Sequence, residues 1–182
     1  MSSRGGQEDS EWDTSAASQT RYAAGDIGVS AAVGRGITVN RFLLDVNVLI
    51  ALIDPAHIQH DRAHGWFAKF GKKAWATCPL TENGVLRIVG HARYPNSPGT
   101  PAAVAELMAS FLALPGHEFW PDDLTLFDSR RIHRARLLDS AQVTDSYLLA
   151  LAATHGGQLT TFDRLLVTDA VVKGPQSLHL IA

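Results

Sequence analysis

Four acidic residues stand next to apolar segments, where a carboxylate could do chemistry. They are Asp45, Glu82, Asp145 and Asp163. Asp45 interrupts a hydrophobic stretch, and a charge in such a place is costly unless it has a partner. Like charges about 4 Å apart repel by about 4 kcal/mol per pair at an effective dielectric constant of about 20. A cluster of these carboxylates would therefore need raised pKa values or a bound cation.

The chemistry that such a cluster supports is hydrolysis assisted by a metal ion. A hard divalent cation prefers oxygen ligands, and Mg²⁺ can polarise a phosphodiester and lower the pKa of an attacking water molecule. Each carboxylate also has a plainer interpretation. Asp145 would favour the start of a helix through the helix dipole, and Asp163 is of a type that forms turns. Only their convergence at one place favours metal-assisted phosphodiester hydrolysis.

The elements that would position these residues alternate between strand and helix. We expect strands at 41–45, 74–78, near 118–120, at 158–161 and at 178–181. We expect helices from 46 to 53, from Asp54 to Gly71, from Pro79 to Gly90, after Thr100-Pro101, over 129–138, and from an N-cap at Thr144 to Gly156. This alternation predicts an α/β fold with a central parallel sheet covered on both faces. Ligands bind at the carboxyl ends of such strands, and all four carboxylates would project toward that edge.

At these residues the sequence resembles a known family. The matching stretches are Phe42–Ile50, Thr81–Arg87, Val143–Ala152 and Leu159–Arg164. In this order they resemble the PIN-domain ribonucleases, and among them the VapC-type toxins of bacterial toxin–antitoxin pairs. The resemblance implies a PIN-like three-layer α/β/α fold over residues 39–182. It also implies endoribonuclease activity that depends on Mg²⁺ or Mn²⁺, and inhibition by a cognate antitoxin.

The resemblance assigns roles to particular residues. Asp45, Glu82, Asp145 and Asp163 would form the catalytic, metal-binding cluster, with Glu82 binding through water or orienting the nucleophile. Asn47 and Thr161 match the auxiliary polar positions of the family. Members of the family are usually dimeric, so a homodimer is also expected.

Residues 1–38 lie outside the resemblance. They are rich in Gly and Ser, have no apolar periodicity, and hold five acidic against three basic residues. We expect a disordered leader or a misassigned start, with translation beginning near Val39.

Composition limits the other functions. The formal net charge of −2 argues against a surface that is basic throughout, so a contact with nucleic acid would be local. The single cysteine, Cys78, excludes an intramolecular disulfide, and no apolar run approaches the ~18 residues of a membrane span. We expect a cytoplasmic protein that does not contact a membrane.

Two further clusters carry charge or metal-binding groups. His57, His60 and His64 share one helix face, but three ligands from one helix make a poor metal site, so we expect them at the surface or core rim. The only dense basic run contains Arg130, Arg131, Arg134 and Arg136. It would suit an RNA backbone, an acidic antitoxin segment, or simply a solvated helix face.

Two other functions remain open at this stage. A haloacid-dehalogenase-type phosphatase also places an aspartate after its first strand, but that chemistry requires a second aspartate where Asn47 stands. A PIN scaffold that only binds its partners should have lost carboxylates, and here all four are present.

Overall fold

Five short strands form a parallel sheet at the centre of residues 40–182, the part of the chain that the computed structural model describes. They are β1 (Phe42–Leu44), β2 (Trp75–Thr77), β3 (His117–Phe119), β4 (Gln158–Thr161) and β5 (Leu178–Leu180). Their order is β3-β2-β1-β4-β5, and every neighbouring pair is parallel. The expected parallel sheet is therefore confirmed, whereas the expected leader at 1–38 lies outside the described residues.

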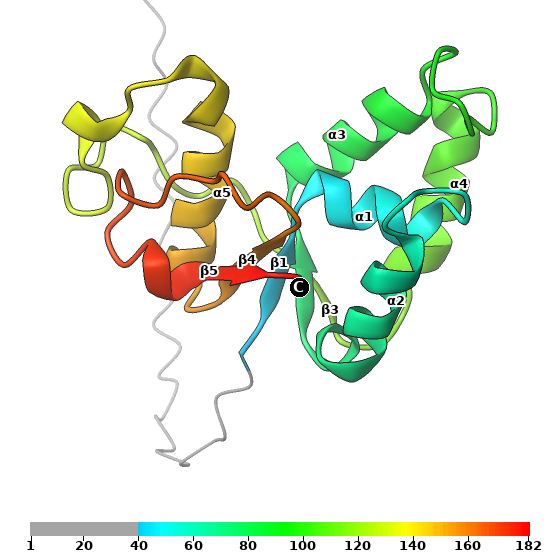
Figure 1. The fold of residues 1–182 in the computed structure, drawn as a ribbon, viewed down its shortest axis with the longest axis horizontal. Coiled ribbons are helices and arrows are strands. Elements are labelled where there is room, and N and C mark those ends of the chain that lie inside the picture. The colour runs from blue at the N-terminus through cyan, green and yellow to red at the C-terminus, as the bar shows by residue number, and fades with distance from the viewer. Residues whose placement is uncertain (1–39) are drawn as a thin grey trace, which may run out of the picture. The chain divides into compact units, whose positions relative to one another are not determined.

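Helices cover both faces of this sheet. They are α1 (Val46–Ile53), α2 (His60–Lys69), α3 (Pro79–Val89), α4 (Pro101–Leu112) and α5 (Val143–Thr154). Figure 1 shows α1 to α4 on one side of the strands and α5 on the other. Side chains alternate along a strand, so Phe42 and Leu44 pack in the core with α1 to α4 while Leu43 packs with α5. The three-layer α/β/α architecture is confirmed.

The helices that follow β2 begin and end where their sequence signals predict. Pro79 opens α3 and Gly90 caps its end, while the Thr100 hydroxyl accepts a hydrogen bond from the Ala103 N–H at 3.2 Å before Pro101 opens α4. In the middle of α3, a Cβ on Gly84 would lie only 2.6 Å from Cγ2 of Val46. A side chain there would push α3 away from the start of α1, so this glycine allows the two helices to approach closely.

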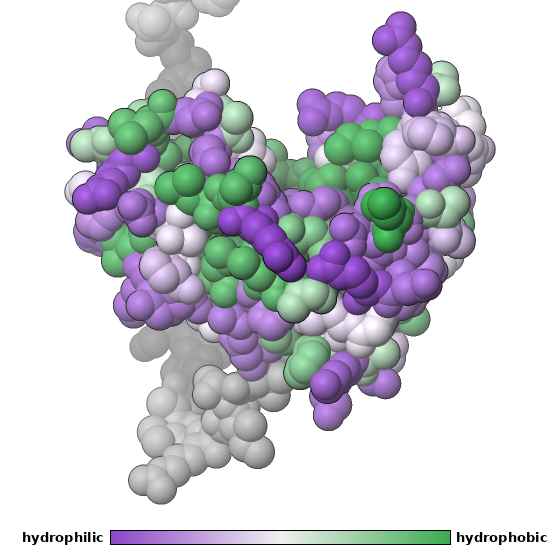
Figure 2. Space-filling model, viewed as in Figure 1, coloured by the Kyte–Doolittle hydropathy of each residue, from purple (hydrophilic) through white to green (hydrophobic). Residues whose placement is uncertain are grey.

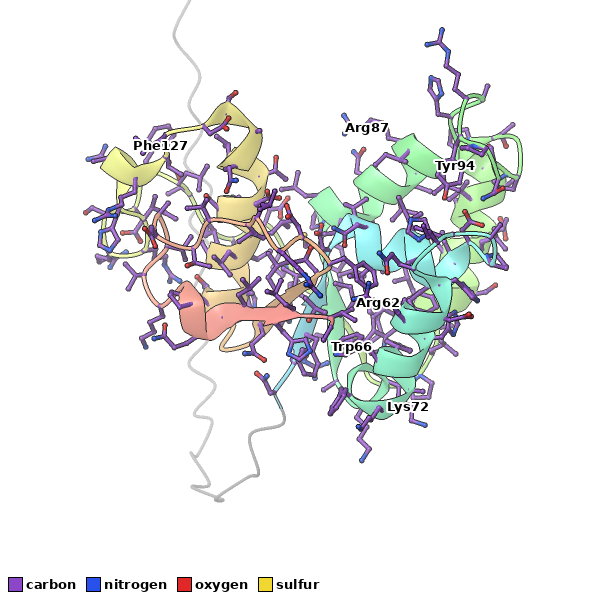
Figure 3. The ribbon with its side chains drawn as sticks, in the orientation of Figure 1. Arg62, Trp66, Lys72, Arg87, Tyr94 and Phe127 are labelled. Atoms are coloured by element: carbon purple, nitrogen blue, oxygen red, sulfur yellow. The ribbon has the colours of Figure 1, made fainter. Side chains whose placement is uncertain are left out.

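The segment after α1 differs from the expected helix at 54–71. Helix α2 begins only at His60, and Ile58 is 92% exposed. The Asp54 carboxylate is buried, where it accepts hydrogen bonds from the Tyr94 hydroxyl at 2.5 Å, Asn96 Nδ2 at 2.9 Å and the Ala56 N–H at 2.9 Å. Asp54 therefore ties the end of α1 to the loop after α3, in which Figure 3 labels Tyr94.

The predicted helix at 129–138 is wrong. Within it the structure has an isolated antiparallel bridge between Ile132 and Val171 and a short 3-10 helix, Arg134–Arg136. The backbone N–H of His133 donates to the Ala170 carbonyl at 2.9 Å, and the Arg131 carbonyl accepts from the N–H of Val172 at 2.8 Å. These backbone groups bind a distant segment, so they cannot form the internal ladder of a helix.

The start of α5 is also two residues earlier than predicted. Gln142 occupies the N-cap position, and Thr144 lies inside the helix. The Asp139 side chain accepts from the Ala141 N–H at 2.9 Å and starts a 3-10 turn, Ser140–Gln142, that leads directly into α5. The 3-10 turn therefore starts α5 in place of a Thr144 cap, and Asp145 lies in the first turn of the helix.

Helix α2 is fixed to the sheet through the edge strand β5. The indole N–H of Trp66 donates to Nε2 of His179 at 2.7 Å, and the Trp66 ring meets Phe42 edge-on with centroids 5.2 Å apart. In Figure 3 the labelled Arg62 and Trp66 lie between α2 and the strands. No helix within residues 40–182 has the length and apolar character needed to cross a bilayer.

Candidate active site

Asp45 stands where β1 ends and α1 begins, and both of its carboxylate oxygens are held. Oδ1 accepts from the Val46 N–H at 2.6 Å, which makes Asp45 the N-cap of α1, and Oδ2 accepts from the Thr161 hydroxyl at 2.7 Å. Burial raises the pKa of Asp45, and the negative charge of Asp163 raises it further, against the lowering effect of these hydrogen bonds. The charged carboxylate is thus fixed in place while its surroundings disfavour its charge.

Thr161, at the end of β4, links the polar groups around Asp45. The register of the sheet pairs Leu44 with Thr160, so the residues that follow meet at the same edge. Besides donating to Asp45, the Thr161 hydroxyl accepts from Asn47 Nδ2 at 3.1 Å and from the Asp163 N–H at 3.1 Å. The structure therefore brings the two predicted auxiliary residues into contact with each other and with Asp45.

Asp145 and Asp163 complete a group of three aspartates. Asp163 lies in the turn after β4, where its Oδ1 accepts from the Leu165 N–H at 2.7 Å, and Asp145 is in the first turn of α5. Burial raises the pKa of Asp145, and the charges of Asp45 and Asp163 add to this effect. Within residues 40–182 no cationic side chain forms an ion pair with any of the three.

Glu82 has a hydrogen-bond partner outside this group. It lies in the first turn of α3, and its Oε1 accepts from the Thr77 hydroxyl at 2.6 Å. The same hydroxyl oxygen is 2.8 Å from Nε2 of His117, and the Thr77 side chain is fully buried. Because a buried hydroxyl needs a partner, Thr77 holds one carboxylate oxygen of Glu82, and Glu82 is not among the charges that shift the pKa of Asp45 or Asp145.

Thr77 and His117 were not predicted as part of the site. The signal that could have found Thr77 is its place at the end of β2, which matches the place of Thr161 at the end of β4. His117 begins β3 and pairs with Trp75 across the sheet, so its proximity follows from strand order rather than from any local motif.

The donor set fits a hard divalent cation. Every candidate ligand is an oxygen atom, and the raised pKa values of Asp45 and Asp145 indicate negative charge that a cation would stabilise. As the side chains are arranged, no three His, Cys, Asp or Glu residues in the described part of the chain lie close enough together to hold an ion. The chemistry of the site therefore suits Mg²⁺ or Mn²⁺, and binding would require the carboxylates to move closer together.

The histidines and arginines singled out from the sequence lie elsewhere. His60 Nδ1 is 2.9 Å from the Ala51 carbonyl and His64 Nε2 is 2.9 Å from the Leu52 carbonyl, so both bind the C-terminal end of α1. Arg131 hydrogen-bonds Thr154 in the last turn of α5, at the end of that helix opposite Asp145. Of the predicted RNA-binding arginines, Arg131 is thus separated from Asp145 by the length of α5.

The surface is hollowed between the part that carries α5 and the part that carries α3 and α4 (Figure 2). Hydrophobic residues are exposed on both sides of this hollow in that view. Leu165, two residues after Asp163, is 82% exposed, and Leu80, two residues before Glu82, is 41% exposed.

Three comparisons place the chain among known proteins. A family model described as PIN domain matches residues 42–167. Ribonuclease VapC44 of Mycobacterium tuberculosis is 44% identical over 140 residues, which cover 77% of this chain and 97% of that protein. Ribonuclease VapC39 of the same species is 44% identical over 128 residues, covering 70% and 92%. A chain in the crystal structure of FitAcB from Neisseria gonorrhoeae shares the fold, with 20% identity, a TM-score of 0.50, and coverage of 67% and 87%.

Proposed function

The chain belongs to the PIN domain family, and we propose that it is a metal-dependent endoribonuclease that acts as the toxin of a toxin–antitoxin pair. The relatives that match it over most of its length are named ribonucleases. The observation that carries the proposal is the group formed by Asp45, Asp145 and Asp163 at one sheet edge. Burial and mutual repulsion raise the pKa of Asp45 and Asp145, and the described residues supply no cation to offset this charge.

Asp45, Asp145 and Asp163 would hold the divalent cation, Mg²⁺ or Mn²⁺. When bound, that ion would polarise the scissile phosphate and lower the pKa of a water molecule. Thr161 and Asn47 would keep the Asp45 carboxylate in one orientation through the hydrogen bonds described above. This fixed orientation favours catalysis, because a metal-binding side chain that had to be ordered during the reaction would raise the activation free energy.

The remaining carboxylate would act on the attacking water molecule. Glu82 is suited to orient that water or to bind the metal through water, while the Thr77 hydroxyl holds its Oε1. Each role is assigned to an oxygen atom of this chain that lies at or next to the carboxyl ends of the strands.

Cleavage of RNA, measured against a phosphomonoester control, tests the proposal. We expect the protein to cut RNA in the presence of Mg²⁺ or Mn²⁺, to stop when EDTA is added, and to leave p-nitrophenyl phosphate intact. Hydrolysis of the phosphomonoester would favour a haloacid-dehalogenase-type phosphatase, although Asn47 stands where that chemistry needs an aspartate. RNA binding without cleavage under all metal conditions would favour a PIN module that only binds.

The partners follow from the same proposal. We expect a homodimer and a cognate antitoxin that blocks the acidic site, with both acting in the cytoplasm, where the RNA substrate is. An arginine of the antitoxin would pair with the aspartates, because a guanidinium binds a carboxylate through two parallel hydrogen bonds. Co-expression with the product of the neighbouring gene should abolish RNA cleavage, and replacing that arginine should restore it. A protein that stays monomeric and binds no such product would contradict the toxin assignment while leaving the nuclease intact.

A further inference from the structure

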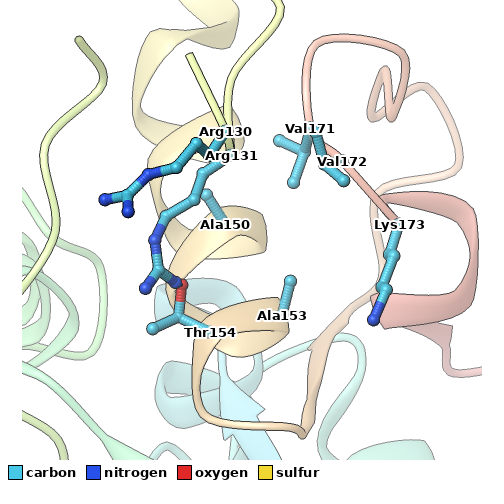
Figure 4. Close-up of a pocket in the computed structure, with 8 residues that line it drawn as sticks. All are labelled: Arg130, Arg131, Ala150, Ala153, Thr154, Val171, Val172 and Lys173. Carbon is cyan, nitrogen blue, oxygen red and sulfur yellow. The ribbon is translucent and has the colours of Figure 1, made fainter. Parts of the chain in front are cut away.

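Two hollows that share Val171, Val172 and Lys173 lie outside the group of aspartates, and the first of them is on the flank of α5. The first has a volume of about 320 Å³ and is lined by Arg130, Arg131, Thr154 and Lys173, among others. Figure 4 shows the two arginines on one side of it, Lys173 on the other, and Ala150 and Ala153 of α5 between them. The second, of about 630 Å³, is lined by His133, Arg136 and Asp169, and Lys173 borders both.

Lys173 is placed between the hollows by an unusual backbone conformation. Its φ of 62° is the only positive φ of a non-glycine residue within 40–182. This region favours glycine, yet the chain has lysine here and glycine at the next position, Gly174. Lys173 also forms no ion pair with any residue of the described part of the chain. Residues in strained backbone conformations are concentrated at sites that bind ligands. A lysine in such a conformation, without an ion-pair partner and beside two hollows, therefore indicates a binding site.

The other cations of this face are only partly neutralised. Arg130 binds Asp128 through two hydrogen bonds of 3.0 and 2.9 Å, and Arg131 lies 3.5 Å from the same carboxylate. Arg136 pairs with Asp169 at 3.3 Å. We define the basic face as Arg130, Arg131, Arg136 and Lys173, the cations that line the two hollows. Two carboxylates, Asp128 and Asp169, accompany these four cations, so the face retains a formal charge of +2.

The basic face lies at some distance from the cleavage site. Arg131 hydrogen-bonds Thr154, which is nine residues after Asp145 in α5. At a rise of 1.5 Å per residue this corresponds to about 14 Å along the helix. A stacked nucleic-acid strand rises about 3.4 Å per nucleotide, so the separation corresponds to roughly four nucleotides.

Resting on the proposed function, we propose that the basic face is a second RNA-binding site that holds backbone phosphates several nucleotides from the bond that is cut. Its substrate would then be an RNA long enough to reach both places. Nucleic acid suits this face better than an acidic polypeptide, because an exposed aromatic side chain, Phe127, accompanies the cations. Phe127 is 77% exposed and directly precedes Asp128, which binds Arg130 and Arg131, so it can stack on an unpaired base next to these cations.

Binding to oligouridylates of two lengths, in EDTA so that no RNA is cut, tests the proposal. The probes are fluorescent strands of about 30 and about 4 nucleotides, and the variant is Arg130→Gln/Lys173→Gln. We expect about tenfold weaker binding of the long strand and less than about twofold change for the short one. The slope of log K against log salt concentration for the long strand should fall by about 1.4, since each lost phosphate contact on a single strand contributes about 0.7.

The matched control removes two cations from other surfaces, in the variant Lys72→Gln/Arg93→Gln. Both residues are exposed and lie outside the basic face, so this protein should bind both strands like the wild type. Thermal melting checks that each variant is folded. If the Lys173 substitution destabilises the protein, Lys173→Gly removes the cation in a residue that accepts the positive φ, and the same loss of long-strand binding is expected.

Other outcomes would overturn the proposal in distinguishable ways. Equal losses for both strands would place these cations at the cleavage site, and no loss would remove them from RNA binding. Competition with polyglutamate tests the alternative that the basic face binds an acidic polypeptide. If polyglutamate displaces the long strand from the wild type at the same concentration as from the variant, it occupies the basic face itself, and this result would count against a site for phosphates. If the wild type cuts RNA but the variant binds the long strand normally, only the second site is refuted. If the wild type neither binds nor cuts RNA, the proposed function itself is refuted.

Discussion

The two ends of α1 each carry a buried or partly buried aspartate that accepts several hydrogen bonds, and the two behave oppositely. Asp45 caps the N-terminal end and Asp54 the C-terminal end. Burial raises the pKa of Asp45, and Asp163 adds to the rise. Burial also raises the pKa of Asp54, but hydrogen bonds from Tyr94, Asn96 and Ala56 outweigh it, so the pKa of Asp54 is lowered.

The neighbours of each aspartate account for the difference. Asp54 accepts hydrogen bonds from three donors, and His57 also lowers its pKa, with no carboxylate among the groups that shift it. Asp45, in contrast, shares its surroundings with Asp145 and Asp163. Hydrogen bonds alone therefore do not show whether a buried carboxylate stabilises the fold. When a carboxylate only accepts hydrogen bonds, its charged form is stabilised and the fold gains stability. When other carboxylates also lie nearby, its charged form is destabilised, and a bound cation would offset that repulsion.

The largest expected effect is on RNA cleavage, which should depend on the aspartate at the N-terminal end of α1 and not on the one at its C-terminal end. Asp45→Asn keeps a good N-cap residue but removes the charge, so RNA cleavage should fall by at least about 10³-fold, given a metal contribution of several kcal/mol. Asp54→Asn should cleave RNA at close to the wild-type rate when assayed below its melting temperature. Comparable losses of cleavage in both variants would contradict the division between a catalytic and a structural end.

The second effect is on stability and has opposite signs at the two ends. Asp54→Asn should lower the free energy of unfolding by about 1–3 kcal/mol, because a buried donor set loses its charged acceptor. Asp45→Asn should leave it unchanged or raise it, because the substitution removes a charge that burial and Asp163 disfavour. Urea denaturation at neutral pH, with unchanged m-values as the check on two-state behaviour, measures both.

The pH dependence of these differences sharpens the comparison. The folded pKa of Asp54 is below its unfolded value, so its stabilisation is complete above about pH 3.9 and is lost as the pH falls through the folded pKa. The folded pKa of Asp45 is above its unfolded value, so its charge destabilises the protein at neutral pH and ceases to do so below about pH 3.9. Melting curves should therefore show both variants approaching the wild type on acidification, one from below and one from above.

A smaller effect is expected when one donor is removed at the structural end. Tyr94→Phe should lower the free energy of unfolding by about 1 kcal/mol, the usual net value of one such hydrogen bond, and should not change cleavage. It should also raise the pKa of Asp54, since the Tyr94 hydroxyl lowers it. Carbon-detected NMR titration of the carboxyl resonances would show this, and an unchanged pKa would mean that the other donors alone set its value.

The smallest effect concerns the coupling between aspartates. Asp163→Asn should lower the pKa of both Asp45 and Asp145, because Asp163 raises both. The same NMR titration measures the two shifts in one experiment, with Asp54 as an internal reference that should not move. If Asp45 and Asp145 titrate as before, the three aspartates do not interact as the structure indicates.

The acidic edge could be predicted from the sequence because local signals determine it. The apolar run before Asp45 predicts a buried strand, and parallel strands bring their carboxyl ends to one edge, so Asp163 follows from the same rule. The direction of the Glu82 side chain could not be predicted in the same way, since it depends on Thr77 and His117, which belong to β2 and β3. The orientation of a long side chain in a first helical turn is a tertiary property.

The same reasoning explains the errors outside the site. The helix expected at 129–138 rested on a run of arginines, whereas the backbone there pairs with residues 170–172, about 40 positions away. The expected helix start at Asp54-Pro55 had a valid local signal, but Tyr94 and Asn96 bind the Asp54 side chain instead. Short-range patterns predicted the strands and helices that have a regular apolar pattern, and failed in the polar segments where distant residues bind the backbone or the capping side chain.

The strand order has a consequence for the chain during its synthesis. The central strand β1 is made first, but β4, which lies beside it, follows only after more than a hundred further residues, and Asp45 and Thr161 are separated by 116 positions. A nascent chain that has emerged only as far as Gly157 already contains Asp45, Glu82 and Asp145, yet it lacks the strand that orients Asp45 and the aspartate that follows that strand. A nascent chain of this length would thus be unable to cut RNA, and any activity would begin only after β4 and Asp163 have emerged from the ribosome.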